Sequence, residues 1–422
     1  MHYDVIVIGA GPGGCMAARE LSTQGFKVLL VEREVLPRDK VCGGFLSAEA
    51  ARLVEDAFGP PPRECLEGPA RVRGVRLLCE GGGTYDLPFF SEGPPRGEGA
   101  SPGEALPPGE ALPPGEGTSP GEGPPPGENA SSGGGASPGK DRFPGEGLAV
   151  KRSLLDAFLA GNCGAEVADG CEVLDFDLGR FRVEMLLRRG GSQERVDATY
   201  LVGADGADSL SLRLLRPEFH RLYAAPHLER GMLVTGEGEA DWDERWMGLA
   251  LTREGSAPAS FFVRGGRIGM AVHTRGGRGW REELENLRAF LSRRVGLVLR
   301  GGVVRSAALR NRMAAAGHYS LGAGCALLVG EAAGLVDPWG FGIRLALESG
   351  RTAAAAIADS AGENITPHLR YRYLMQPLLE REAEQRRRFA GKVGELDVSA
   401  LSSPRGRRER RDRRALRRRL SR

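Results

Sequence analysis

The first thirty residues alternate between continuous apolar runs and a run of small residues. A β-branched run from Val5 to Ile8 leads into a glycine turn, a small-residue segment from Cys15 to Gln24, and a second apolar run from Val28 to Val31. Short apolar runs bounded by turn residues are typical of buried strands, and the small-residue segment has the length of a helix. The pattern therefore predicts a βαβ unit.

Further elements follow the same kinds of pattern. The segment after residue 148 has Leu154, Leu155, Phe158 and Leu159 at helical spacing, which predicts a helix. A second long helix of small residues is expected from Ile343 to Ala358, and helical segments from His368 onwards. The expected strands lie at 72–78, around Val167, and at 181–187, 198–202, 267–272 and 326–329.

Residues 92–147 interrupt this order with repeated Pro-Gly-Glu units and almost no aromatic or β-branched side chains. Such a composition cannot bury enough apolar surface to offset the entropy of ordering. We expect a disordered insertion there, with no chemistry of its own. The segment from 214 to 305 has more aromatic residues and several strand-like pieces, which indicates a separate domain inserted into the first.

Composition places the chain among folded enzymes. Of its 422 residues, 41% are hydrophobic and 27% charged, near the average for globular proteins. The seven cysteines are scattered without metal-ligand spacing, so we expect no metal site and a reducing compartment. The start of the chain does not resemble a signal peptide, and no apolar run is long enough to span a bilayer. The predicted location is the cytoplasm.

The net charge of +3 conceals a basic tail at residues 404–422. Eleven arginines stand there against Glu409 and Asp412, a local charge of +9, which leaves about −6 for the rest of the chain. Leu416 and Leu420 lie four residues apart among the arginines. Two interpretations stay open: peripheral docking on anionic lipid, or a solvated charged end. No motif supports binding to nucleic acid.

The glycine turn carries the first chemical motif. Gly9, Gly11 and Gly14 form a G-x-G-x-x-G pattern, with Gly13 inside it, between a strand and a helix. Such glycines permit a tight turn, close approach of a pyrophosphate and close packing of helix on strand. Glu32 ends the second strand, where a carboxylate accepts hydrogen bonds from an adenosine ribose, and Arg33 follows it. The unit therefore predicts a dinucleotide site.

Two further stretches distinguish FAD from NAD. Leu201 to Gly206 ends a strand in Ala204-Asp205-Gly206, and Leu328 to Gly334 ends another around Glu331. Together with the N-terminal glycines, they resemble the three motifs of the FAD-dependent hydroxylase superfamily. That resemblance implies that Asp205 lies near the FAD pyrophosphate and that Glu331 contacts the ribityl chain.

Within this superfamily the chain resembles the geranylgeranyl reductase family most closely. Three segments carry the likeness: Lys40-Val41-Cys42-Gly43-Gly44-Phe45-Leu46-Ser47, the helix start at Arg152, and Asp337-Pro338-Trp339-Gly340-Phe341-Gly342-Ile343. The resemblance implies that Cys42 and Gly43 lie beside the flavin. Backbone N–H groups at Gly342 and Ile343 would face the flavin pyrimidine edge. For Arg152, pairing with cofactor oxygens and a surface salt bridge both stay open, and for Cys42 so does the role of an inert buried thiol.

The fold that follows is α/β, with a Rossmann-type FAD-binding domain carrying ββα additions, an inserted antiparallel-sheet substrate domain and a helical C-terminus. We assign the FAD-binding domain to three segments, residues 1–91, 148–213 and 306–362. The substrate domain is assigned to 214–305, and C-terminal helices to 363–403.

The sequence departs from the family pattern in places. Glu331 stands where the family has Asp, Arg213 is one residue further from Ser209 than usual, and the aromatic Trp-x-Phe-Pro strand is replaced at residues 260–264. The aromatic residues Trp246, Phe261 and Phe262 are expected either to line an apolar pocket or to pack in the core. FAD affinity is expected to be lower than usual if the Glu331 carboxylate is displaced.

These observations predict an FAD-dependent oxidoreductase that reduces C=C bonds of a hydrophobic substrate. NAD(P)H or a small electron carrier would supply the electrons. A flavin-dependent monooxygenase and a non-catalytic FAD-binding protein are the alternatives. No catalytic residue is assigned, because the flavin itself carries the hydride. His273 is the one histidine that we would test as a proton donor.

Overall fold

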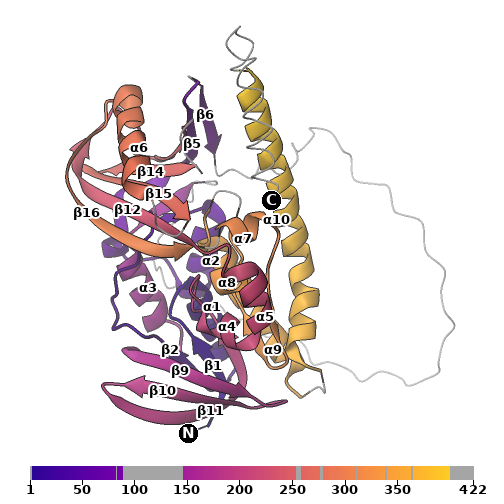
Figure 1. The fold of residues 1–422 in the computed structure, drawn as a ribbon. Helices are drawn as coiled ribbons and strands as arrows, with labels where there is room; N and C mark the ends of the chain where they lie inside the picture. Colours follow the sequence, from indigo (N-terminus) through magenta and orange to yellow (C-terminus); the bar gives the residue numbers. More distant parts are fainter. Residues whose placement is uncertain are drawn as a thin grey trace, which may run out of the picture. The chain divides into compact units, whose positions relative to one another are not determined.

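The computed structural model describes residues 2–81, 83–88, 146–252, 258–275, 279–309, 311–337, 340–362 and 365–399 (Figure 1). Nearly all of the predicted insertion and the whole basic tail, residues 404–422, lie outside the described residues. The exception is the end of the insertion, where Gly147 already begins strand β7 (Gly147–Val150).

An eight-stranded sheet contains the predicted βαβ unit. The strand order is β17-β18-β11-β1-β2-β8, with β1 parallel to both β2 and β11, and β9 and β10 extend one end of β11 as an antiparallel meander. Val5, Ile6 and Val7 are fully buried, as expected for a central strand with parallel neighbours on both sides. The strands are β1 (His2–Ile8), β2 (Val28–Val31), β8 (Glu166–Ala168), β9 (Cys171–Leu178), β10 (Val183–Arg189), β11 (Ser192–Gly203), β17 (Gly322–Ala323) and β18 (Ala326–Leu328).

Two helices from opposite ends of the sequence pack together on this sheet. They are α1 (Pro12–Thr23) and α9 (Ile343–Ser360), and both bury faces rich in alanine and glycine. The long helix α10 (Pro367–Ser399) packs along α9, and α3 (Arg152–Gly161) contacts α1. Small side chains allow the helix axes to approach closely, which explains why the sequence of both helices is so poor in large residues.

A second sheet has seven strands in the order β16-β12-β15-β14-β13-β5-β6, antiparallel except for the parallel pair β13 and β5. Its strands are β5 (Gly74–Cys79), β6 (Thr84–Pro88), β12 (Glu229–Glu239), β13 (Trp246–Leu251), β14 (Ala259–Arg264), β15 (Arg267–Arg275) and β16 (Val298–Leu309). Strands β5 and β6 come from the segment that we assigned to the FAD-binding domain. Strand patterning shows which face is buried but not which sheet a strand joins, so the sequence could not reveal this pairing.

The two faces of the second sheet have different apolar partners. On one face, Phe261 packs with Leu287 and Phe290 of helix α6 (Trp280–Val295) (Figure 1). On the other face, Phe262 packs with Phe45, which belongs to a three-stranded sheet in the order β3-β7-β4, where β3 is Phe45–Leu46 and β4 is Leu66–Val72. Neighbouring residues of a strand point to opposite faces, so the two phenylalanines serve separate cores.

Shorter helices complete the fold. They are α2 (Ala48–Phe58), α4 (Leu210–Leu215), α5 (Pro217–Phe219), α7 (Asn311–Ala315) and α8 (Gly330–Ala333), with a 3-10 turn at Arg63–Cys65 and a π-helical turn at His220–Ala224. Within the described residues, no helix combines the length and the apolar character needed to cross a membrane. The predicted fold class, α/β with a Rossmann-type domain and a largely antiparallel second sheet, is confirmed.

Candidate functional site

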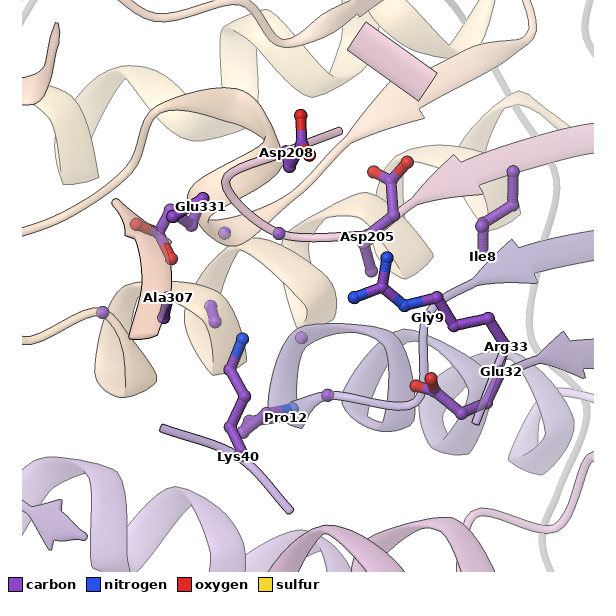
Figure 2. A pocket seen from close by; sticks show the side chains of 18 of the residues that line it. Ile8, Gly9, Pro12, Glu32, Arg33, Lys40, Asp205, Asp208, Ala307 and Glu331 are labelled. Atoms are coloured by element: carbon purple, nitrogen blue, oxygen red, sulfur yellow. The ribbon is translucent and has the colours of Figure 1, made fainter. Parts of the chain in front are cut away.

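A cavity of about 480 Å³ lies where the carboxyl ends of β1, β2 and β11 meet. Figure 2 shows the turn from Gly9 to Pro12 between two ends of this cavity, with Glu32 and Arg33 at one end and Lys40 and Glu331 at the other. The end of β16 and the start of α9 contribute further lining. Ligands of doubly wound sheets bind at this edge, outside the carboxyl ends of the strands.

The glycine turn has the shape that a pyrophosphate requires. Gly9 has φ +101°, and a Cβ atom there would lie 2.6 Å from the carbonyl oxygen of Ala204. A Cβ on Gly14 would lie 2.0 Å from the carbonyl oxygen of Gly9. At Gly11, by contrast, a Cβ would meet no atom of the described residues within 4 Å. Gly9 and Gly14 are therefore needed by the fold, whereas the missing side chain of Gly11 opens the cavity.

Two helices begin at the cavity wall. Gly11 is the N-cap of α1 and Gly342 is the N-cap of α9; neither helix has a side-chain cap or an acidic residue in its first turn. Free N–H groups and the helix dipole make such a terminus favourable for negative charge. An elongated anionic ligand would meet the start of α1 along its length and the start of α9 towards one end.

Glu32 is held in place by three donors. Its carboxylate accepts hydrogen bonds from the backbone N–H groups of Ala10 (3.0 Å) and Glu34 (3.2 Å) and forms an ion pair with Nε of Arg38 (3.1 Å). Only 5% of the residue is exposed. The carboxylate thus joins the end of β2 to the glycine turn, and it lines the cavity where a ribose is expected. Arg33 beside it is exposed and lies 3.6 Å from the carboxylate of Glu34.

A buried ion network continues from Glu32. Arg38 donates to Asp156 (3.0 Å), and Arg152 donates to both oxygens of Asp156 through Nε and Nη2 (2.9 Å each). Burial alone would lower the pKa of Arg152, but the charge of Asp156, assisted by an interaction with the thiol of Cys42, raises it above the ordinary value. Arg152 is therefore neither a surface salt bridge nor unpaired: it lines the cavity with its charge already balanced by Asp156.

Asp205 holds the turn between β11 and α4. Its carboxylate accepts hydrogen bonds from Oγ of Ser209 (2.6 Å) and from the backbone N–H (2.9 Å) and Oγ (3.1 Å) of Ser211. Burial raises its pKa, and these hydrogen bonds oppose the increase. The carboxylate shapes the cavity wall through this turn, since Ala204 and Gly206 also line the cavity.

The other end of the cavity collects residues from three distant segments. Cys42 lines it and accepts a hydrogen bond from the backbone N–H of Gly44 (3.4 Å). Glu331 from α8 and Ile343 from α9 also line it (Figure 2 labels Glu331), as does Gly342. Phe341 donates its backbone N–H to Asp337 (2.7 Å), which fixes the loop before α9.

Some predicted residues lie behind the cavity wall. Among the described residues, Gly14 and Gly43 are not part of the lining, although Gly9, Gly11 and Gly13 are. His273 is half-buried on β15, where Nδ2 of Asn311 lies 3.5 Å from its Nδ1, and burial lowers its pKa to about 4. Asn311 in turn lies beside Gly340, which does line the cavity.

The sequence missed several lining residues. Arg38 was not singled out. Nor was its pairing with Asp156, which does not itself line the cavity and stands four residues after Arg152, the spacing of ion pairs on a helix. No signal in the sequence pointed to residues 171–174 of β9 or 307–309 of β16, which reach the cavity only through tertiary folding.

An apolar cluster adjoins the cavity near Val41 and Phe341. It contains Phe45, Phe262 and Leu249 and packs against Val41, which itself lines the cavity, and Phe341, which lies between the lining residues Gly340 and Gly342. Phe261 belongs instead to the opposite core, against Trp242 (4.6 Å between ring centroids), and the ring of Trp246 lies 4.9 Å from the guanidinium of Arg76. Of the three aromatic residues predicted for an apolar pocket, only Phe262 belongs to this cluster.

Within the described residues, no group of three or more His, Cys, Asp or Glu side chains could hold a metal ion. Residues 2–57 match the FAD binding domain family. The N-terminal segment, which contains the glycine turn and Glu32, is thus similar to FAD-binding domains.

Comparisons with known proteins agree with the architecture. A geranylgeranyl diphosphate reductase of Rhodobacter capsulatus is 35% identical over 88 residues, 21% of this chain and 20% of that protein. A flavin-dependent monooxygenase of Mycobacteroides abscessus is 34% identical over 98 residues, 23% of this chain and 20% of that protein. These alignments cover only about a fifth of each relative.

The fold extends much further. The crystal structure of a geranylgeranyl bacteriochlorophyll reductase-like protein from Thermoplasma acidophilum superimposes with a TM-score of 0.66, covering 96% of this chain and 89% of the other at 19% identity. The fold is therefore that of FAD-binding, Rossmann-type oxidoreductases. The predicted resemblance to the geranylgeranyl reductases is confirmed by the partial sequence similarity and by the fold.

Proposed function

We propose that this chain is an FAD-dependent oxidoreductase that reduces C=C bonds of a hydrophobic, isoprenoid-like substrate. The observation that carries the proposal is the junction between the cavity and the apolar cluster around Phe262, because a flavin ring bound at that end would have apolar side chains beside it. Bound FAD would supply hydride transfer through its N5 atom. The protein's part is to hold the cofactor, exclude water and position the double bond.

The residues that we propose for cofactor binding would contact different parts of FAD along the cavity. Backbone N–H groups of Gly11 and Gly13 would bind the pyrophosphate, with Gly9 and Gly14 shaping the turn, and Glu32 and Arg33 would face the adenosine half. Arg152 and Asp205 would support the middle of the cofactor. Glu331 would accept hydrogen bonds from the ribityl hydroxyls, and the N–H groups of Gly342 and Ile343 would face the pyrimidine edge. Cys42 and Gly43 would lie beside the ring.

The electron donor in this proposal is NAD(P)H or a small electron carrier that binds transiently. No second dinucleotide motif is visible in the sequence, which argues against a resident nicotinamide cofactor. The basic tail would add contact with anionic membrane, where hydrophobic substrates accumulate.

The proposal is tested with purified protein loaded with FAD. The flavin is reduced with dithionite without oxygen, and geranylgeranyl diphosphate or a geranylgeranylated lipid is then added. We expect the flavin absorbance to return and the substrate to gain two mass units for each double bond reduced. If the flavin stays reduced and the mass of each added geranylgeranyl compound is unchanged, the proposal of an isoprenoid reductase is contradicted.

A flavin-dependent monooxygenase is the second proposal, supported by the similarity to the M. abscessus monooxygenase. Rapid mixing of the reduced protein with oxygen separates the two. A monooxygenase shows an absorbance transient distinct from both flavin states, and its substrate gains the mass of one oxygen. A colourless protein that takes up no added FAD would instead support a non-catalytic role.

A further inference from the structure

Arg264, the last residue of β14, is the most deeply buried arginine of the described chain, with 1% of its surface exposed. Its Nη1 atom donates to the carboxylate of Glu67 (3.0 Å). Its Nε and Nη2 atoms have no hydrogen-bond partner within the described residues, and no other described residue has two such atoms. Buried polar groups nearly always have partners, and a charged group needs them most.

The two unpartnered atoms form one edge of the guanidinium. Three other arginines of the described chain use the same two atoms, Nε and Nη2, to bind a carboxylate. The pairs are Arg76 with Asp86, Arg152 with Asp156, and Arg245 with Asp243, at 2.6–2.9 Å. This fork matches the two oxygens of a carboxylate in distance and direction. Arg264 thus presents a carboxylate-binding edge for which the described chain supplies no carboxylate.

The local charge fits a monoanion. Glu67 is shared, because it also pairs with Arg267, so two guanidinium groups face a single carboxylate. One positive charge is therefore unbalanced. Burial lowers the pKa of Arg264 to about 10, against the opposing charge of Glu67, yet the group stays protonated at neutral pH. A carboxylate balances this charge, whereas a phosphate dianion exceeds it.

The surroundings of Arg264 place it beside the proposed active site. Its guanidinium lies over the rings of Phe45 (3.7 Å) and Phe262 (4.7 Å), both members of the apolar cluster. A Cβ on Gly44 would lie 3.8 Å from its Nη1, so Arg264 is behind the Cys42–Gly44 turn, and Cys42 lines the cavity. Stacking against aromatic rings keeps a guanidinium in place and leaves its edge available for hydrogen bonds.

We propose that Arg264 binds the carboxylate of an apolar carboxylic acid, whose hydrocarbon part packs in the cluster of Phe45 and Phe262. This deepens the proposed function, on which it rests for the reaction: the substrate class becomes an unsaturated, carboxylated hydrocarbon. Hydrogen bonds from Nε and Nη2 would fix how far the acid enters the site, and this would determine which of its carbons lie beside the cofactor.

The test uses the FAD-loaded full chain and three probes of equal chain length: octanoate, 1-octanol and octyl phosphate. Isothermal titration calorimetry at pH 7.5 measures each affinity. We expect octanoate to bind at least tenfold more tightly than either of the others. Equal affinities for octanoate and octanol, or no octanoate binding, overturn the proposal, and tighter binding of octyl phosphate overturns its choice of a carboxylate.

Variants locate the site. Arg264→Gln is expected to lower octanoate affinity at least tenfold while octanol binding is unchanged, and Arg264→Lys to give an intermediate affinity, since ammonium lacks the fork. Arg245→Gln, which breaks a bidentate pair just before β13, is the control and should bind octanoate normally. Undiminished binding by Arg264→Gln would overturn the proposal. If that variant does not fold, the wild-type comparison of probes still decides. Visible absorbance reports the flavin content of each sample, so a failure of the proposed function is seen separately.

Discussion

Gly350 in α9 lies directly on the backbone of Gly13 in α1. A Cβ atom on Gly350 would be 2.3 Å from the carbonyl oxygen of Gly13 and 3.3 Å from the backbone nitrogen of Ala17. The first and last nucleotide-site helices therefore meet backbone to backbone. Because α1 begins at the glycine turn and α9 begins at the flavin end, this contact sets the distance between the two helix starts.

Gly350→Ala should separate the helices, because the methyl group has no space and faces rigid backbone. We expect a loss of about 1–3 kcal/mol in the free energy of unfolding, together with weaker FAD binding. Urea unfolding and flavin titration measure the two effects. Gly161→Ala at the end of α3, where a Cβ meets nothing within 4 Å, is the control and should change neither. Equal behaviour of the two variants would contradict this account of the helix contact.

Gly11→Ala should separate cofactor binding from folding. Gly11 has φ −83°, and no described atom lies within 4 Å of an added Cβ, so the protein without FAD should unfold within about 1 kcal/mol of wild type. The methyl group would occupy space that the pyrophosphate needs, and FAD affinity should fall at least tenfold. Thermal unfolding with and without FAD measures both. A variant that still gains the full FAD-dependent rise in melting temperature would show that the pyrophosphate lies elsewhere.

Glu331→Asp tests the departure from the family pattern. Removing one methylene withdraws the carboxylate by about 1.5 Å, one C–C bond length. If the longer side chain displaces the ribityl hydrogen bond, we expect Glu331→Asp to bind FAD several-fold more tightly and Glu331→Gln to bind it no better than wild type. Quenching of flavin fluorescence gives the dissociation constants. Weaker FAD binding by the aspartate variant would mean that the longer Glu331 side chain places its carboxylate better for the ribityl hydrogen bond.

Asp156→Asn should be far more destabilising than Asp86→Asn. Both carboxylates pair bidentately with an arginine, Arg152 and Arg76 respectively, but Asp156 is fully buried and also neutralises Arg38, whereas Asp86 is exposed. Removing one partner of a buried network costs about 3–5 kcal/mol, and an exposed pair contributes about 0–1 kcal/mol. Chemical denaturation of the two variants gives the comparison. Similar losses of unfolding free energy in the two variants would show that the buried ion network stabilises the fold no more than an exposed ion pair does.

His273 should make folding sensitive to mild acid. Its pKa is lowered by burial from 6.5 to about 4, so the folded state binds a proton less readily than the unfolded state. The stabilisation is complete above about pH 6.5 and is lost as the pH falls towards about 4. His273→Gln, which cannot titrate, should show a shallower decline of unfolding free energy between pH 6.5 and 4.5. If the unfolding free energy of the two proteins declined in parallel with pH, the lowered pKa of His273 would be contradicted.

The local sequence was sufficient to predict the elements that carry the cofactor-binding motifs. The glycine turn, the strand ending at Glu32 and the helix starting at Ile343 were all predicted, because positive φ, helix starts and buried apolar runs are properties of a few neighbouring residues. The fold class followed from their order along the chain.

Only the tertiary structure decided which distant residues meet. It joined β5 to β13 and paired Asp156 with both Arg152 and Arg38 behind the cavity wall. It also placed Arg264 against the rings of Phe45 and Phe262 with one donor edge unpartnered in the described chain. Such contacts depend on strand pairing and on the burial of charge across long stretches of sequence. Periodicity and motif spacing carry no information about either, since they report on one segment at a time.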